Sequence, residues 1–218
     1  MTRGLALIGV SISLGGRVLV PPLDLAIGPR CIATVMGPSG AGKSTLLAFI
    51  GGFLEPAFTA AGRVLVDGED VTSLPAERRR LGLLFQDDLL FPHLSVGGNL
   101  GFGLAANVYG RAKRQARIDE ALAQAGLAGF AARDPATLSG GQRARVALMR
   151  TLLAEPRALL LDEPFAKLDT ALRQEIRGFV LAHARARDLP TLLVTHDPAD
   201  AAASGGPVVM LGEAPGQP

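Results

Sequence analysis

The feature that most constrains the fold is a glycine-rich stretch, GPSGAGKST, at Gly37–Thr45. It fits the pattern G-x-x-x-x-G-K-[ST], follows an apolar run typical of a buried strand (CIATVM), and opens a run typical of a helix (KSTLLAFIG). Glycines let consecutive backbone N–H groups turn inward around phosphate oxygens, and a helix N-terminus adds partial positive charge. The stretch therefore predicts a nucleoside triphosphate site on a strand–loop–helix unit.

Two side chains of this loop have roles that follow from their chemistry. Lys43 is expected to reach the β- and γ-phosphates, and the Ser44 hydroxyl is expected to bind Mg²⁺. Kinases, GTPases and motor ATPases share such a loop, so the loop alone does not identify the reaction. The residues expected to bind the nucleotide here are Gly37, Pro38, Ser39, Gly40, Ala41, Gly42, Lys43, Ser44 and Thr45.

The order of strand-like and helix-like patterns predicts an α/β fold. Continuous apolar runs such as ALLLDEP and TLLVTHD are typical of strands buried on both faces of a parallel sheet. Near the N-terminus, LALIGVSISL and LDLAI indicate antiparallel strands. From Ser95 to about Glu155 the patterns are helical. We predict a P-loop NTPase fold with a mixed-sheet core and an N-terminal antiparallel β-subdomain (1–88 and 156–218), and an inserted helical subdomain (89–155).

Four polar residues follow predicted core strands. Asp162 and Glu163 end the run ALLLDEP, and the carboxyl ends of parallel strands meet the ligand crevice. Asp162 is expected to hold Mg²⁺ through its water shell, and Glu163 to act as general base on the attacking water. His196 and Gln86 end two other strands at the same predicted edge. We expect His196 to sense the γ-phosphate by a hydrogen bond, and Gln86 to reach Mg²⁺ or the lytic water.

A second short run, LSGGQRARVALMR at Leu138–Arg150, decides among the reaction classes. It resembles the signature of the ATP-binding cassette (ABC) ATPases. Ser139 precedes a helix that begins with glycines, so this is a second phosphate-binding helix start. One nucleotide does not need two such cradles on one chain. Two chains arranged head to tail do, because each glycine loop then faces the partner's signature and two ATP molecules are sandwiched.

The resemblance to the ABC ATPases covers nearly the whole chain, in the family's order of motifs. It implies ATP and Mg²⁺ as ligands and a homodimer or paired cassette in the ATP-bound state. Carried onto matching positions, it implies a glutamine loop, a signature, a second Walker motif, a dimer-contacting loop and a switch histidine. Gln86 corresponds to the glutamine loop, and Ser139, Gly140, Gly141 and Gln142 correspond to the signature. Asp162 and Glu163 correspond to the second Walker motif, Asp169 to the dimer-contacting loop, and His196 to the switch histidine.

The stretch LLFQDDLLFPHLSVGGNLGFGL resembles the importer-type branch of the family, in which residues after the glutamine meet a permease's coupling helix. The resemblance implies docking of integral membrane permease subunits on region 86–100, in a complex that can include a solute-binding protein. It also explains a surplus of apolar side chains that we expect to be exposed, with His93 in the same surface. These are Leu89, Leu90, Phe91 and Leu94.

Hydropathy and composition bear on location. Mean hydropathy is +0.30, yet no stretch approaches the roughly 18 uncharged apolar residues that a membrane span requires. We expect a peripheral subunit on the cytoplasmic face of the inner (plasma) membrane. Arginine is favoured over lysine, and alanine and glycine are abundant, which suggests a GC-rich bacterial genome.

Two further sequence features concern the side chain that would cover the nucleotide base and a run of charged residues. The family stacks adenine on an aromatic residue upstream of the phosphate loop, whereas the corresponding place here holds Ile12 or Leu14, which would cover the base more weakly. The run ERRR at Glu77–Arg80 is interpreted as a solvated face.

Two other functions remain as alternatives to a transport ATPase subunit. A non-transport ABC ATPase acting on DNA or ribosomes is disfavoured, because the net charge of +2 leaves no electrostatic footprint for nucleic acid. The chain also has one cassette and no long coiled-coil insertion. A nucleotide-binding module that no longer hydrolyses is disfavoured because the four catalytic candidates Lys43, Gln86, Glu163 and His196 and the metal-binding candidate Asp162 are all present.

Overall fold

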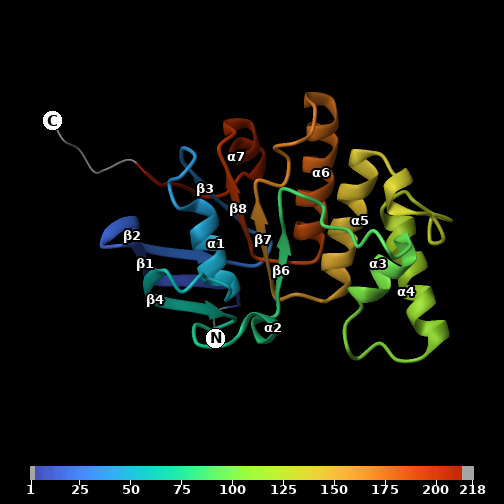
Figure 1. The fold of residues 1–218 in the computed structure, drawn as a ribbon, viewed down its shortest axis with the longest axis horizontal. Coiled ribbons are helices and arrows are strands. Elements are labelled where there is room, and N and C mark those ends of the chain that lie inside the picture. Colours follow the sequence, from blue (N-terminus) through green and yellow to red (C-terminus); the bar gives the residue numbers. More distant parts are fainter. Residues whose placement is uncertain (1–2, 213–218) are drawn as a thin grey trace. The chain divides into compact units, whose positions relative to one another are not determined.

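A computed structural model describes residues 3–212, which divide into two compact units (Figure 1). The core unit consists of the chain up to Leu83, of Arg157–Glu163, and of the chain from Leu181 onward. The helical unit consists of Leu84–Pro156 and Pro164–Val180. The helical unit thus includes a second segment, after Glu163, that lies outside the predicted insertion.

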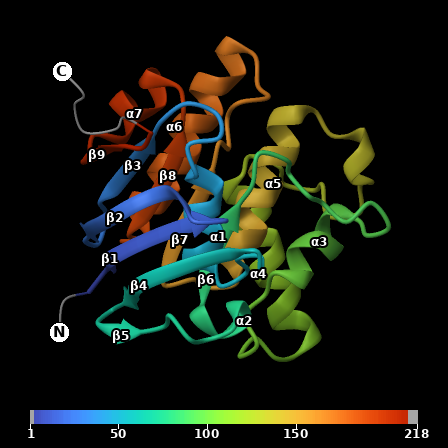
Figure 2. The same cartoon turned by 60° about the vertical axis from the view of Figure 1, so that its left-hand side comes forward.

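The core unit contains an antiparallel sheet in the order β2-β1-β4-β5 (Figure 2). Buried residues recur along β1 with the spacing of a strand that has one face in the core, as at Leu5, Leu7, Val10 and Ile12. The predicted N-terminal antiparallel strands are therefore confirmed. The strands are β1 (Leu5–Leu14), β2 (Arg17–Ile27), β4 (Phe58–Val66) and β5 (Glu69–Asp70).

The core unit also contains a five-stranded sheet in the order β6-β7-β8-β3-β9, in which β3 pairs in parallel with β8 and β9, and β7 pairs in parallel with β8. All residues of β8 are buried, which explains its apolar middle residues, whereas Thr191 and Thr195 at its two ends are buried polar residues. Side chains of both sheets and of the helix after β3 share one hydrophobic cluster. The strands are β3 (Ile32–Met36), β6 (Leu81–Leu84), β7 (Ala158–Asp162), β8 (Thr191–Thr195) and β9 (Val208–Met210).

Helices complete both units. In the core unit, α1 (Lys43–Gly51) follows β3 and contacts β7, and α7 (Pro198–Ser204) follows β8. In the helical unit, α3 contacts α4 and α5 (Figure 1). The helices of that unit are α3 (Val96–Phe102), α4 (Arg111–Gln124), α5 (Gly140–Leu153) and the first part of α6 (Thr170–Ala186). Over residues 3–212, no helix combines the length and apolar character that crossing a membrane demands.

The interpretation of ERRR as a solvated face is wrong for Arg79, which is only 5% exposed at the end of α2 (Ala76–Arg79). Its guanidinium donates to four backbone carbonyls at 2.6–2.8 Å, those of Phe49, Ile50, Thr72 and Leu74. Two of these carbonyls belong to the last turn of α1, where carbonyls lack helical partners and carry partial negative charge. Arg79 therefore caps the C-terminus of the helix that the phosphate loop opens.

Arg79→Gln is expected to lower the free energy of unfolding by roughly 3 kcal/mol, because hydrogen bonds to a buried charged group contribute about 1.5–3 kcal/mol and several are lost together. Urea denaturation measures the change. Arg78→Gln removes the neighbouring exposed guanidinium and is expected to change stability by less than about 0.5 kcal/mol. Equal effects of the two substitutions would contradict the capping role.

Candidate nucleotide site

The conformation of the phosphate loop requires its glycines. Gly42 has φ of +87° and stands directly before α1, and Gly40 has φ of +81°. A Cβ at Gly37 would lie 2.4 Å from the carbonyl oxygen of Leu211, so a larger residue does not fit there. No side chain caps the N-terminus of α1. Its first N–H groups are therefore available to an anion, as the sequence pattern predicts.

Lys43 is nearly buried, with 5% of the residue exposed. Its Nζ donates to the carbonyl oxygens of Gly37 and Pro38, each at 2.9 Å, and lies 3.5 Å from Oε1 of Glu163. The ammonium therefore folds back over its own loop. Triphosphate oxygens are stronger acceptors than peptide carbonyls, because hydrogen bonds between ionised partners are about twice as strong as neutral ones.

Ser44 and Asp162 form the pair of oxygens that could hold a metal. The Ser44 hydroxyl donates to Oδ1 of Asp162 at 3.1 Å. Burial raises the pKa of Asp162 above its ordinary value, and the charge of Glu163 adds to the effect, while the Ser44 hydrogen bond and Lys43 oppose it. A carboxylate and a hydroxyl fit Mg²⁺, which takes few protein ligands and fills its octahedron with water and phosphate oxygens. Over residues 3–212, no group of three or more His, Cys, Asp or Glu side chains is arranged to hold a metal ion.

Glu163 lies between a cation and an imidazole. Its Oε2 is 2.9 Å from Nδ1 of His196, and its Oε1 is the atom near Lys43. The backbone of Glu163 is left-handed, with φ of +44°, although its N–H donates normally to Val194 O at 2.9 Å. Non-glycine residues adopt this conformation rarely and chiefly where surrounding structure enforces it. With this backbone conformation the carboxylate lies between the Lys43 ammonium and the His196 imidazole.

Asp200 is a positioning residue that the sequence reasoning missed. Its carboxylate is buried and accepts from Oγ1 of Thr195 at 2.9 Å, and the same Thr195 oxygen accepts from the N–H of Asp197 at 3.0 Å. These bonds hold the turn that carries His196 from β8 into α7. The available signal was the pattern D-P-x-D, in which an N-cap aspartate is followed three residues later by another acidic residue.

The signature residues belong to the helical unit. The Ser139 hydroxyl accepts from the N–H of Gln142 at 3.3 Å, and Oε1 of Gln142 accepts from the N–H of Ser139 at 3.0 Å. This reciprocal capping box explains why serine and glutamine stand three apart. A Cβ at Gly141 would lie 2.5 Å from Cδ1 of Leu172, whereas the space around Gly140 is open to about 3.9 Å.

The remaining two candidates also belong to the helical unit. Asp169 caps α6, since its Oδ1 accepts from the N–H of Leu172 at 3.0 Å. Gln86 is exposed and follows β6 by two residues. The structure therefore brings Lys43, Ser44, Asp162, Glu163 and His196 together in the core unit, and the other candidates belong to the second unit.

The two candidates for covering the nucleotide base differ in burial. Ile12 is 1% exposed and part of the hydrophobic core, so it cannot contact a base, while Leu14 is 42% exposed at the end of β1. The next strand passes directly beside the phosphate loop, because Cγ2 of Val20 lies 3.0 Å from where a Cβ of Gly42 would be. Val18 is exposed as well, but it pairs with Ser13 while Val20 pairs with Ile12, and the irregularity between these two pairs places Val18 on the other face of the strand. Leu14 is thus the exposed one of the two side chains predicted to cover the base.

The apolar segment after Gln86 is less exposed than predicted. Leu89 is 56% exposed, but the expectation is wrong for Leu90, Phe91 and Leu94, which are half-buried. The fully buried Asn99 explains the difference. Its amide accepts from the N–H of Phe91 at 2.8 Å and donates to three carbonyls, of Phe91, Leu94 and Ser95, folding the segment back onto α3.

Two exposed aromatic side chains of the helical unit escaped the sequence reasoning. Phe102 is 69% exposed and packs edge-on against Phe91, with ring centres 4.7 Å apart. Tyr109 is 77% exposed. The signal that could have found them is their isolation, because they interrupt a stretch otherwise rich in glycine and alanine.

Comparison with known proteins gives consistent matches. The family model described as ABC transporter matches residues 20–166. The chain is 47% identical over 188 residues to the ABC transporter ATP-binding protein YnjD of Escherichia coli, covering 86% of each chain. It is 42% identical over 207 residues to the Fe(3+) ions import ATP-binding protein FbpC of Streptomyces coelicolor, covering 95% of this chain and 59% of that one.

A third relative is the putative 2-aminoethylphosphonate import ATP-binding protein PhnT of Salmonella typhimurium, 40% identical over 201 residues, with 92% of this chain and 54% of that one covered. The chain therefore spans little more than half the length of the two import proteins, although it spans most of the Escherichia coli protein.

Proposed function

The chain belongs to the family of ABC transporter ATP-binding proteins, and from this membership we propose that it binds and hydrolyses ATP to energise solute transport through separate permease subunits. The observation that carries the proposal is the group formed by Lys43, Glu163 and His196, with Ser44 and Asp162 paired beside it. Import functions in the names of relatives favour an importer. The relatives reported above give no support to an action on DNA or ribosomes.

The reaction follows from the chemistry of these side chains. Loop N–H groups and Lys43 would hold the β- and γ-phosphates, and Lys43 would exchange its two loop carbonyls for phosphate oxygens. Mg²⁺, when held by Ser44 and Asp162, supplies positive charge that stabilises the transferring phosphoryl group. Glu163 would accept a proton from the attacking water, and His196 would hydrogen-bond the γ-phosphate.

We further propose that hydrolysis needs two chains arranged head to tail. The support is the second helix start, where Ser139 caps α5 and the space around Gly140 is open. This helix start offers a phosphate contact on the helical unit. Gly141, Gln142 and Asp169 would complete this contact. ATP would close the dimer and hydrolysis would reopen it, so the motion of the helical unit is available to a membrane partner.

A permease is the proposed partner of the helical unit. The docking surface, defined as Leu89, Phe91, Leu94 and Phe102, is apolar and partly exposed. Beside it lies an open cavity of about 640 Å³. Three glycines of α3 and two alanines line part of it, and small side chains allow a partner helix to approach closely. These are Gly97, Gly98, Gly101, Ala131 and Ala132. The chain would thus be a peripheral subunit on the cytoplasmic side of the inner membrane, in a complex that can include a solute-binding protein.

Leu89→Glu and Phe102→Glu are each expected to abolish co-purification with membrane subunits, because a charge placed in an apolar contact is left unpaired. Basal ATP hydrolysis of the detached subunit is expected to stay within about twofold of wild type, since surface substitutions rarely disturb the fold. Pull-down from solubilised membranes measures the first effect, and phosphate release the second.

Met210→Glu is the matched control for these substitutions, since it places the same charge on another exposed apolar side chain, outside the docking surface. Normal co-purification of the Leu89 and Phe102 variants would refute the docking surface. Loss of co-purification in the Met210 variant as well would show that the effect is not local.

A further inference from the structure

The segment directly after Gln86 is fastened to the C-terminal half of α5 by Arg150. Nη1 of Arg150 donates to the carbonyl oxygen of Leu89 at 2.8 Å, and Nη2 donates to that of Asp88 at 3.2 Å. The guanidinium also lies 5.3 Å from the centre of the Phe91 ring. One side chain of the signature helix therefore holds the backbone on which Leu89 is displayed.

The same segment is fastened to the N-terminal end of α5 by Arg143. Nε of Arg143 lies 3.5 Å from Oδ2 of Asp88, and Nη1 donates to the carbonyl oxygen of Leu138 at 2.8 Å. The residue after Leu138 is Ser139, the cap of the signature helix. Arg143 stands seven residues before Arg150, which is about two helical turns and places both on one face. A single guanidinium thus contacts both the segment after Gln86 and the chain that leads into the signature.

Asp88 needs this partner. The residue is half-buried, and burial raises the pKa of its carboxyl above the ordinary value, while the charge of Arg143 opposes the rise. A carboxylate withdrawn from water is stable only with a cation or hydrogen-bond donors nearby. The half-buried Asp88 carboxylate therefore depends more on its Arg143 partner than a fully solvated carboxylate would.

The backbone at Leu89 gives an independent indication. Leu89 has φ of +46°, a left-handed conformation that a leucine seldom adopts. Its carbonyl oxygen is the one that Arg150 binds most closely. The conformation that exposes the Leu89 side chain is thus held by a contact from α5, and movement of α5 must change it.

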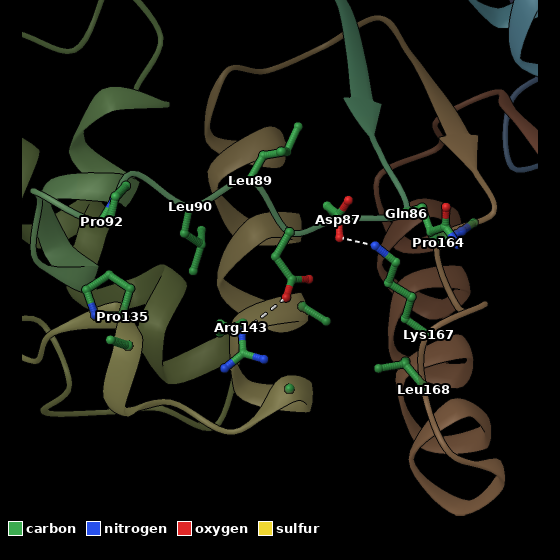
Figure 3. A pocket seen from close by; sticks show the side chains of 14 residues that line it. Gln86, Asp87, Leu89, Leu90, Pro92, Pro135, Arg143, Pro164, Lys167 and Leu168 are labelled. Atoms are coloured by element: carbon green, nitrogen blue, oxygen red, sulfur yellow. Dashed lines mark hydrogen bonds and ion pairs between the residues drawn. The ribbon is translucent and has the colours of Figure 1, made fainter.

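Asp88 and Arg143 line a cavity of about 420 Å³, and a second ion pair lines the same cavity. This second pair serves as a comparison. Asp87 pairs with Lys167, as Figure 3 shows beside the Arg143 contact. Both side chains of this second pair are more than half exposed. Exposed ion pairs hold their geometry weakly, because water and salt screen them. Removing the carboxylate of Asp87 therefore makes the same charge change as removing that of Asp88, without cutting a link to α5.

We propose that Asp88, Arg143 and Arg150 are positioning residues that transmit a change at Ser139 to the backbone of Leu89, so that docking at Leu89 and engagement of a partner's nucleotide at Ser139 are energetically coupled. This rests on the proposed function, in which Ser139 contacts the nucleotide of a second chain. Coupling between two sites is reciprocal by thermodynamic necessity. ATP-driven pairing must then alter the surroundings of Leu89 even when no permease is present.

The experiment places an environment-sensitive fluorophore at residue 89 of the full chain. Leu89→Cys is labelled with bimane in a Cys31→Ser background, which removes the single native cysteine. Glu163→Gln is added to hold ATP uncleaved. We expect Mg²⁺ and ATP to change the bimane emission as the dimer forms in sedimentation runs. In Asp88→Asn and in Arg150→Gln that change is lost, although ATP still binds and the dimer still forms.

Two further variants make the result specific. Asp87→Asn is expected to keep the full emission change. Arg143→Lys keeps a cation with N–H donors near Asp88 and the Leu138 carbonyl, and it is expected to keep the emission change that Asp88→Asn loses. Thermal melts check that each variant is folded, and the comparison of Asp88→Asn with Arg143→Lys keeps the test decisive if Arg150→Gln proves unstable.

The outcomes separate the two proposals. If ATP leaves the Glu163→Gln parent monomeric, the head-to-tail function fails and this inference fails with it. If the dimer forms but residue 89 does not respond, or if the response persists in both Asp88→Asn and Arg150→Gln, the coupling alone is overturned. If the partner chain merely covered residue 89, the emission change would persist in both variants. This explanation is therefore told apart from the proposed coupling.

Discussion

Glu163→Gln is expected to lower the rate of ATP hydrolysis by about 100-fold to 10,000-fold, because a glutamine amide cannot accept a proton from the attacking water. ATP binding is expected to be preserved, since Lys43 and the loop N–H groups are unchanged. The substitution also removes the carboxylate that lies 3.5 Å from the Lys43 ammonium. Uncleaved ATP should then hold two chains together.

The measurements for Glu163→Gln are phosphate release, ATP affinity by calorimetry, and the mass of the protein with and without ATP by light scattering. Glu55→Gln makes the same change at an exposed position and is expected to behave as wild type. Turnover close to that of wild type would remove Glu163 as the base. A mass that stays monomeric with saturating ATP would remove the shared-site arrangement while leaving the base assignment standing.

Asp162→Asn is expected to have effects of opposite sign on stability and on catalysis. Asparagine keeps an oxygen for the Ser44 hydroxyl but carries no charge to hold a cation. Losing the metal's charge stabilisation, which is worth several kcal/mol, lowers turnover by about 100-fold or more. Stability without ligand should rise, because the half-buried carboxylate, whose ionised form is unfavourable in the folded protein, is gone.

The pH dependence gives the sign of that stability change. The pKa of Asp162 is raised in the folded protein, so its ionised form is less favourable there than in the unfolded chain. The penalty is absent below the unfolded pKa of 3.8, grows as pH rises through the raised folded value, and is complete above it. Melting temperatures of ligand-free wild type and Asp162→Asn should therefore converge in acid and separate toward neutral pH.

Two readouts check Asp162→Asn. Mg²⁺ should strengthen ATP binding to the wild type and have little effect on the variant, as EDTA titration would show. Asp188→Asn, at an exposed carboxylate in the core unit, is the control and should retain both turnover and the response to Mg²⁺. A variant that is less stable than wild type at neutral pH would contradict the unfavourable burial of Asp162.

Elements whose shape depends on local sequence were predicted well. The phosphate loop was recognisable because Gly40 and Gly42 have positive φ and Gly37 has a backbone neighbour that excludes a Cβ. The two core strands β7 and β8 were recognisable because burial on both faces favours the apolar residues that fill their middle positions. The capping box at Ser139 and Gln142 has its partners within three residues, so its pattern is visible in the sequence.

Features that depend on distant segments were not predictable in the same way. Arg79 looked solvated because its neighbours in sequence are charged, yet its partners include carbonyls of α1, about thirty residues earlier. The half-burial of Phe91 and Leu94 depends on Asn99, whose polar side chain turns inward to bond the backbone of that segment.

The sequence by itself determined the chemistry to be expected of this protein: which groups are predicted to bind phosphate, which oxygens suit Mg²⁺, and which carboxylate is placed to take a proton. Such motifs are short, and the backbone geometry that they require admits few residue types. Only the tertiary structure decided which side chains meet, as in the contacts of Glu163 with Lys43 and His196, and which apolar residues face outward. The reason is that the burial of a side chain and its pairing with another depend on residues far apart in the chain. A local sequence pattern does not specify which distant residues come together.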